Sequence, residues 1–221
     1  MSSNGPSATN GIRLSIKRLI DLTIAGGTLL ICSPIMAFVA ILILLRMGSP
    51  IIFRQTRPGY MGEPFDVVKF RTMRDAVDSE GRPLSDAERL TNLGRFLRRT
   101  SLDELPQLWN VIKGDMSLVG PRPLLTEYLD RYTSEQMRRH NVKPGITGMS
   151  QISGRQQIPF SKRLELDVYY VDHRSLSLDM KILFATAKLV AKRSGVLPGQ
   201  DVADVDDLGL THTNGKVERK E

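Results

Sequence analysis

The chain has 221 residues, with 31 Lys and Arg against 24 Asp and Glu, and a formal net charge of +7. This length suits one domain with a core of ordinary size. The charge favours anionic partners, which could be nucleic acid, lipid head groups or phosphorylated substrates. The single cysteine, Cys32, lies in an apolar run, so the sequence offers no disulfide framework and no cysteine-based metal site.

Near the N-terminus, residues 1–11 are rich in Ser, Asn and Gly and are expected to form a flexible leader. An uncharged apolar segment then runs from Leu22 to Leu45. As one helix it would be about 36 Å long at about 1.5 Å per residue, which is enough to cross a hydrocarbon core of about 30 Å. A signal peptide is a poor match, because the segment is too long and no small-x-small cleavage motif follows it. The sequence therefore predicts attachment to a membrane.

Two features complicate a simple membrane span. Ser33-Pro34 lies near the middle of the apolar segment, where proline removes a backbone hydrogen bond and bends a helix. The hydroxyl of Ser33 could satisfy a carbonyl that the proline frees. Basic residues also flank both ends, namely Arg13, Lys17, Arg18, Arg46, Arg54 and Arg57. A helix that enters, bends and leaves by the same face keeps both clusters in the cytoplasm, whereas a span exports one of them against the positive-inside tendency. The residues alone leave both topologies open.

The remaining segments predict a small domain that is mostly helical. Residues 51–75 alternate apolar and polar side chains around a Pro-Gly turn, which is typical of a hairpin. We expect helices at 85–99, 127–141, 161–173 and 177–195, with a loop at 143–160. The helix at 177–195 combines a wide apolar face with lysines, which suits an anionic membrane surface, although an ordinary core-facing helix fits equally well. The tail from Pro198 is expected to be disordered.

An acid pair, Asp103 and Glu104, follows Arg98 and Arg99. Structurally, Ser101 and Glu104 match the S-x-x-E capping box at the start of a helix. Such a box needs only the glutamate, however, and the two arginines can hold a carboxylate in its charged, nucleophilic form. Both interpretations stay open from the pair alone.

Further basic residues favour the chemical interpretation. Pro121 and Pro123 restrict the backbone around Arg122, so its guanidinium loses little freedom when it binds a phosphate. Lys69 and Arg71 are additional candidates, with a solvated strand face as the alternative. An ionised carboxylate among convergent cations fits covalent phosphoryl transfer. The expected cofactor is Mg²⁺, held by carboxylate and phosphate oxygens.

The motifs together resemble the monotopic phosphoglycosyl transferases, the bacterial sugar transferase family. The resemblance covers Ile16 to Gly195 and rests on the apolar segment broken by "SP", "FRQTRPG", "KFRTM", "TSLDELPQLWNVIKGDMSLVGPRPLL", "KPGITGMSQISGR" and "LELDVYYVD". Within the family, the chain most resembles the small enzyme that starts bacterial protein N-glycosylation, whose donor is UDP-N,N′-diacetylbacillosamine.

This resemblance implies an α+β, predominantly helical fold with amphipathic interface helices. It divides the chain into a leader (1–11), a re-entrant membrane helix broken at Ser33-Pro34 (12–48), a cytoplasmic catalytic domain (49–197) and a tail (198–221). The implied location is the bacterial inner membrane.

The resemblance also implies a reaction and the residues that carry it. Asp103 would attack the sugar-bearing phosphate of a UDP-sugar and expel UMP, and polyprenyl phosphate would then take the phosphosugar in a ping-pong sequence. Glu104 would assist as the second member of the dyad and, with Asp103, as an Mg²⁺ ligand. The implied substrate-binding residues are Lys69, Arg98, Arg122 and Arg155, while Asp167 lies in a matching segment without an assigned role.

Two other functions compete with this interpretation. A membrane-bound phosphatase with an aspartyl nucleophile would be expected to carry D-x-D spacing, which is missing around Asp103. A non-catalytic basic module that binds nucleic acid would need aromatic residues among its basic clusters, and the sequence does not interleave them. Nucleic acid is therefore not an expected partner, and the identity of the sugar and a homo-oligomeric state are left open.

Overall fold

The structure, a computed structural model, describes residues 8–82, 84–154, 157–192 and 206–210. Helices dominate, and the two sheets each have two strands, so the predicted α+β, mostly helical class is confirmed. The strands are β1 (Ile52–Pro58), β2 (Pro64–Phe70), β3 (Ser117–Val119) and β4 (Gly145–Thr147). The α-helices are α1 (Ala8–Met47), α2 (Asp86–Arg89), α3 (Asn92–Thr100), α4 (Gln107–Lys113), α5 (Ser134–Met137), α6 (Met149–Ile152), α7 (Phe160–His173) and α8 (Leu176–Lys192). Short 3₁₀ helices are η1 (Tyr60–Gly62), η2 (Leu102–Glu104), η3 (Thr126–Arg131) and η4 (Arg138–Asn141).

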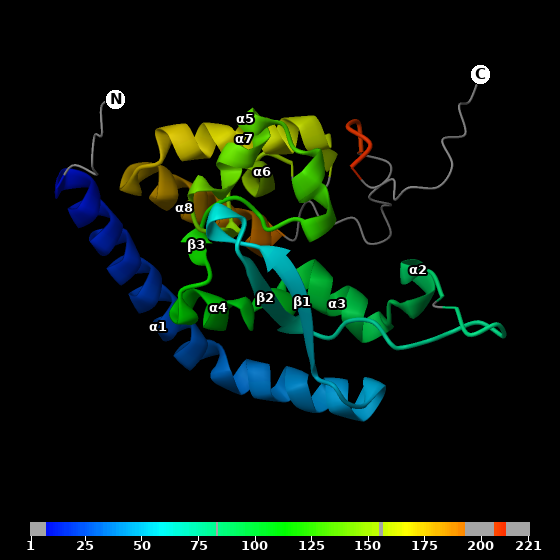
Figure 1. Ribbon diagram of the computed structural model, residues 1–221. Coiled ribbons are helices and arrows are strands. Elements are labelled where there is room, and N and C mark those ends of the chain that lie inside the picture. The colour runs from blue at the N-terminus through cyan, green and yellow to red at the C-terminus, as the bar shows by residue number, and fades with distance from the viewer. Residues whose placement is uncertain (1–7, 83, 155–156, 193–205, 211–221) are drawn as a thin grey trace, which may run out of the picture.

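Helix α1 contains the apolar segment and bends near its middle (Figure 1). Pro34 lies inside it and cannot donate to the carbonyl of Leu30, four residues earlier. The Ser33 hydroxyl donates to that carbonyl instead, at 2.8 Å. The expected role of Ser33 beside the proline is therefore confirmed, and it explains how the helix continues through the bend.

Both halves of α1 lie against the rest of the chain. Before the bend, Ala25 is fully buried in a core cluster that it shares with Leu108 and Val111 of α4. After the bend, Val39 and Ile43 pack in a second cluster with Phe70 and Leu97. The side chains nearest the bend behave differently, since Leu30 is 77% exposed and Ile31 78% exposed. The bend thus presents an apolar surface that the described part of the chain does not cover.

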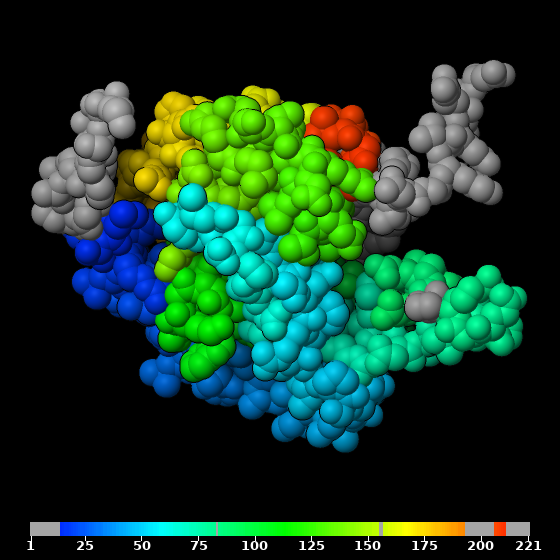
Figure 2. Space-filling model, in the orientation of Figure 1, coloured from blue at the N-terminus to red at the C-terminus, as the bar shows by residue number. Residues whose placement is uncertain are grey.

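The hairpin crosses the middle of the molecule and is held by α4 (Figures 1 and 2). Strands β1 and β2 pair antiparallel from Ile52 opposite Phe70 to Pro58 opposite Pro64, so the hairpin prediction is confirmed. Buried Asn110 of α4 supports the outer edge of β2, because its Oδ1 accepts from the Val68 amide and its Nδ2 donates to the Asp66 carbonyl. This bond pair fixes β2, which carries Lys69, relative to the segment that precedes α4.

The second sheet lies where α4, α8 and α1 meet. Strands β3 and β4 are parallel, with Ser117 opposite Gly145 and Val119 opposite Thr147. Asp21 of α1 covers the other edge of β3, accepting from the Ser117 hydroxyl at 2.8 Å and the Leu118 amide at 3.3 Å. Strand β3 then leads directly into the segment that contains Arg122.

Several predicted elements differ from the structure. The helix expected at 85–99 is two helices, because Leu90 bridges to Met73 and the Thr91 amide donates to the Thr72 carbonyl. The helix expected at 127–141 is η3, α5 and η4, since Thr133 starts a new capping box with Gln136. The loop expected at 143–160 contains β4 and α6. The helices expected at 161–173 and 177–195 are confirmed as α7 and α8, although residues 193–195 lie outside the described range.

The two ends of the chain also differ from expectation where they are described. Helix α1 begins at Ala8, so residues 8–11 of the expected leader are helical. In the tail expected to be disordered, residues 206–210 are described and packed, with Leu210 only 3% exposed beside Tyr128, Phe160 and Leu164. The rest of both expected segments, 1–7, 198–205 and 211–221, lies outside the described residues.

Candidate active site

The acid pair lies in a sharp turn between α3 and α4. Ser101 has a left-handed backbone, with φ 58° and ψ 18°, which ends α3 and starts η2. The Ser101 side chain makes no capping hydrogen bond to η2, and Glu104 faces Lys69 and Arg122 instead. The capping-box interpretation of this pair is therefore wrong. In the described residues, capping boxes occur at Ser85 and Thr133.

Glu104 is bound by two cations from distant parts of the chain. Lys69 Nζ of β2 and Arg122 Nη2 both donate to Glu104 Oε1, at 2.8 and 2.6 Å. Burial raises the pKa of Glu104, but Arg122 and Lys69 outweigh it and hold the pKa well below its ordinary value. Glu104 is therefore ionised at neutral pH. Its ion pairs with Lys69 and Arg122 hold β2 and the Arg122 segment next to the acid pair.

Asp103 has a different environment although it is the adjacent residue. It is 8% exposed, and within the described residues no hydrogen bond reaches its carboxylate. Burial and the neighbouring Glu104 charge raise the pKa of Asp103, while Lys69, Arg122 and Arg98 oppose that rise. Burial also lowers the pKa of Lys69, against the opposite effect of Glu104. The result is a carboxylate without a local partner in a cationic surrounding, which suits attack on an anionic electrophile.

Arg98 of α3 is held near Asp103 by Thr72, which lies just after strand β2. Its Nε donates to the Thr72 hydroxyl at 3.1 Å, and Thr72 itself is buried. The approach of α3 to this segment is close, because a Cβ on Gly94 would lie 1.9 Å from the Thr72 carbonyl oxygen. Gly94 thus allows the packing that brings Arg98 near Asp103.

Arg122 is supported from behind by a buried ion pair. Arg139 Nη2 donates to the Arg122 carbonyl at 2.6 Å and to Asp167 Oδ2 at 2.7 Å. Both Arg139 and Asp167 are 2% exposed, and the Ser150 hydroxyl donates to the second oxygen of Asp167. Asp167, which received no role from the sequence, therefore fixes the backbone of Arg122 through Arg139.

The structure thus brings together Lys69, Arg98, Asp103, Glu104 and Arg122. Arg155 lies outside the described residues. Arg71 is directed elsewhere, donating to the carbonyls of Ser49 and Met73 and to Asp75.

Sequence reasoning missed one cation at this site. Burial and the charge of Arg122 lower the pKa of Arg57 to about 10. The positive charges of Arg57 and Arg122 repel each other, so the space between them suits an anion. The sequence signal for Arg57 was its place in "FRQTRPG", immediately before the hairpin turn.

Within the described residues, no group of three or more His, Cys, Asp or Glu side chains could hold a metal ion. The acid pair still offers oxygen ligands. Lys69 and Arg122 both bind Oε1 of Glu104 and leave Oε2, and the Asp103 carboxylate is without a hydrogen bond in the described chain. Mg²⁺ is commonly held by one or two carboxylates together with substrate phosphates and water. The donor set therefore fits a magnesium ion that arrives with a phosphorylated substrate.

Comparison with known proteins gives consistent matches. The family model described as bacterial sugar transferase matches residues 12–193. The sugar transferase EpsL of Bacillus subtilis is 54% identical over 181 residues, covering 82% of this chain and 90% of EpsL. The UDP-glucose:undecaprenyl-phosphate glucose-1-phosphate transferase of Klebsiella pneumoniae is 41% identical, covering 81% of this chain and 41% of that protein. The undecaprenyl-phosphate galactose phosphotransferase of Salmonella typhimurium is 40% identical, with coverages of 81% and 41%.

These matches confirm the resemblance at the level of the family and its enzyme class. The chain spans about two fifths of the length of the Klebsiella and Salmonella relatives. These two relatives are named for the transfer of glucose and galactose phosphates. The predicted resemblance of this chain to the enzyme that uses UDP-N,N′-diacetylbacillosamine therefore stays a prediction. On the match to residues 12–193 and on these identities, the chain belongs to the bacterial sugar transferase family.

Proposed function

We propose that this chain transfers a phosphosugar from a UDP-sugar to undecaprenyl phosphate and releases UMP. The names of the Klebsiella and Salmonella relatives support this reaction class. The observation that carries the proposal is the contrast within the dyad. Glu104 is held as an anion by Lys69 and Arg122, while Asp103 lies beside the same cations without a hydrogen bond from the described chain.

The proposed first step is attack by an Asp103 carboxylate oxygen on the sugar-bearing phosphorus of the donor. A new bond forms between that oxygen and phosphorus, and the bond from phosphorus to the bridging oxygen breaks, so UMP leaves with the electron pair. In the second step an oxygen of polyprenyl phosphate attacks the same phosphorus, and the bond to Asp103 breaks. The products are polyprenyl diphosphate-sugar and a regenerated carboxylate.

The surrounding cations have defined tasks in this scheme. Arg122, Lys69 and Arg98 would spread the negative charge that builds on the phosphoryl oxygens. Asp103 and Glu104 would hold Mg²⁺, which when bound supplies positive charge that offsets the repulsion between the carboxylate and the anionic donor. Arg155 is proposed as a further phosphate contact on the strength of its motif alone.

The re-entrant topology is proposed for α1. The segment Leu14–Met47 is long and apolar enough to cross a membrane, and its apolar 18-residue stretch has a mean hydropathy of 2.7 with only 11% of it buried. Residues on both sides of Pro34 nevertheless pack on the same domain, while Leu30, Ile31 and Phe38 near the bend are exposed. A helix that spans the bilayer would carry one half away from that domain. These contacts therefore support a helix that dips into the cytoplasmic face of the inner membrane and returns.

Two other surfaces support the proposal that the domain lies on the membrane. Met180 and Phe184 are exposed one turn apart on α8, with Phe184 71% exposed, and lysines accompany them along the helix. Trp109 of α4 is 59% exposed. Aromatic and basic residues of this kind are favoured at the boundary between lipid head groups and acyl chains.

The ping-pong step is tested without the lipid acceptor. Purified protein in detergent, supplied with a UDP-sugar, Mg²⁺ and labelled UMP, should move label into UDP-sugar through reversal of the first step. Asp103→Asn should abolish this exchange, and Leu208→Ala, a change at an exposed position outside the dyad and its cations, should retain it. A requirement for polyprenyl phosphate before any exchange occurs would contradict the covalent intermediate. A panel of UDP-sugars, including UDP-glucose and UDP-galactose, then identifies the donor.

A further inference from the structure

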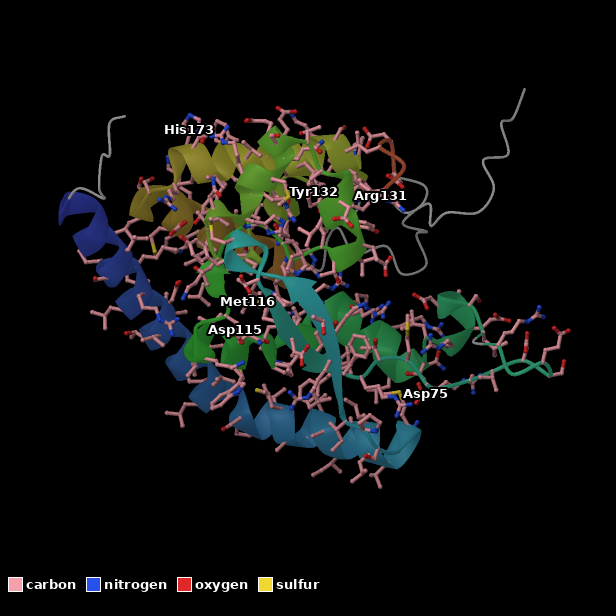
Figure 3. The ribbon with its side chains drawn as sticks, in the orientation of Figure 1. Asp75, Asp115, Met116, Arg131, Tyr132 and His173 are labelled. Atoms are coloured by element: carbon pink, nitrogen blue, oxygen red, sulfur yellow. The ribbon has the colours of Figure 1, made fainter. Side chains whose placement is uncertain are left out.

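Residues 206–210 lie beyond the family match at 12–193, yet they dock on the domain. We call this segment, Asp206–Leu210, the C-terminal clip. Leu210 is 3% exposed in a cluster with Tyr128, Phe160 and Leu164. Arg131 lies beside the clip (Figure 3), and its Nη1 donates to the carbonyls of Gly209 at 3.1 Å and Leu210 at 2.7 Å. On this side the domain therefore contacts the clip through the buried Leu210 side chain and through two backbone carbonyls.

The clip has a compact shape of its own. Asp206 Oδ1 accepts from the amides of Leu208 and Leu210, at 3.3 and 2.9 Å. Gly209 has a φ of 67°, in the region that favours glycine, and this closes the turn. This geometry leaves Asp207 on the side that faces α7.

Asp207 supplies the N-terminal cap that α7 lacks in its own sequence. The N-cap residue, Pro159, makes no side-chain capping bond. Asp207 Oδ1 instead accepts from the Ser161 amide at 3.0 Å, and Asp207 Oδ2 accepts from the Ser161 hydroxyl. A carboxylate at this position satisfies a free amide and interacts favourably with the helix dipole. The cap comes from 46 residues away, so it holds only while the clip is docked.

Helix α7 connects this cap to Arg122, one of the cations that bind Glu104. Its second turn carries Asp167, which binds Arg139, and Arg139 in turn donates to the Arg122 carbonyl. Its first turn carries Arg163. Burial and the charge of Arg122 lower the pKa of Arg163, and Asp167 and Asp207 oppose that shift. The clip is thus linked by direct contacts to the backbone that presents Arg122.

We propose that Asp207 and Leu210 of the clip are positioning residues for the transferase reaction, acting through α7 on Arg122. This inference rests on the function proposed above. In the docked state, Arg122 is fixed in a position to bind the diphosphate of the donor. When the clip is detached, α7 loses its cap and the Arg122 segment loses a fixed support.

The test uses two leucines of the clip as a matched pair. Leu210 is buried, whereas Leu208, two residues earlier, is 41% exposed. Truncating a buried leucine removes about 2 kcal/mol or more, which is about a 30-fold loss in the docking equilibrium. We expect Leu210→Ala to raise the KM for UDP-sugar about 10-fold and to change kcat less than about threefold, since the dyad itself is untouched. Leu208→Ala should leave both constants unchanged.

A second arm supplies the clip in trans. A chain ending at residue 205 should show the same raised KM, and a synthetic peptide of residues 203–213 should lower it again in a saturable way. The same peptide with Leu210→Ala should leave the raised KM unchanged. Arg131→Met should reproduce the defect in the full chain and add nothing to it in the shortened chain, because both changes remove one interaction.

The outcomes separate this inference from the proposed function. Binding of the labelled 203–213 peptide to the shortened chain, and protection of the Ser161 amide from hydrogen exchange, can be measured even if no UDP-sugar is turned over. Unchanged KM in the shortened chain, equal effects of Leu208→Ala and Leu210→Ala, or an increase in activity on truncation would each overturn the positioning role. An increase would indicate an inhibitory tail instead.

Discussion

Asp103 and Glu104 are adjacent but differ in what surrounds their carboxylates. Glu104 has two direct cationic partners, and Asp103 has none within hydrogen-bonding distance in the described chain. The pKa shifts follow from this difference, downward for Glu104 and upward for Asp103. The structure therefore assigns the anchoring role to Glu104 and leaves Asp103 available for chemistry.

The raised pKa of Asp103 predicts a dependence of stability on pH. In the unfolded chain Asp103 loses its proton at a lower pH than in the folded chain, so its charge destabilises the fold above both pKa values. Asp103→Asn should therefore raise the thermal midpoint at pH 7.5, and this gain should shrink as the pH falls through the raised pKa. Differential scanning fluorimetry from pH 4 to 8 measures it. A gain that grows on acidification would contradict the burial of an unpaired carboxylate.

The buried pair Arg139 and Asp167 predicts an asymmetric response to mutation. Asp167→Asn leaves the Arg139 charge buried without its counter-charge, which costs about 3–5 kcal/mol of unfolding free energy. The double variant Arg139→Met with Asp167→Leu removes both charges and should be less destabilised than the single variant. Urea titration of the detergent-solubilised proteins compares them. Equal stability of Asp167→Asn and wild type would show that the pair does not support the fold.

At the scale of elements, α1 is joined to β3, α4 and α8 by polar contacts. Asp21 binds the outer edge of β3, and Lys17 bridges Asp21 at 3.8 Å and Asp179 of α8 at 2.7 Å. Arg18 adds bonds to the carbonyls of Val111 and Ile112 at the end of α4. Since β3 leads into the Arg122 segment, the contacts that fix α1 on β3 also support the site.

Asp21→Asn tests this support. The amide of asparagine offers only one acceptor oxygen, so either the Ser117 hydroxyl or the Leu118 amide loses its partner, at a cost of about 1–3 kcal/mol. We expect a lower urea midpoint and slower UMP release. Thr23→Val is the matched control, because that hydroxyl is exposed and bonds only within α1. Wild-type behaviour of Asp21→Asn would mean that α1 does not position β3.

For the whole molecule, local pattern and motif predicted much of the fold. The hairpin, α7 and α8 follow from periodicity and turn residues, and the apolar segment and its Ser33-Pro34 bend follow from composition. The acid pair and its cations were also identified, because their residue types already limit the chemistry.

What the sequence could not predict depends on contacts between distant residues. The expected helix at 85–99 is divided because Thr91 bonds to the hairpin exit, and no local pattern reports that contact. The Arg139–Asp167 pair joins residues 28 apart. Leu210 is buried by Tyr128 and Phe160, so a segment of low apolar content docks where composition alone indicates disorder.

The most direct test of the central claim is the mass of the protein after brief exposure to a UDP-sugar and Mg²⁺ without polyprenyl phosphate. We predict an increase equal to one phosphosugar, located by peptide mapping on Asp103 and removed when polyprenyl phosphate is added. Asp103→Asn should remain at its unmodified mass. An unmodified wild-type protein that nevertheless converts UDP-sugar and lipid phosphate to product, or a phosphosugar found on another residue, would contradict the account.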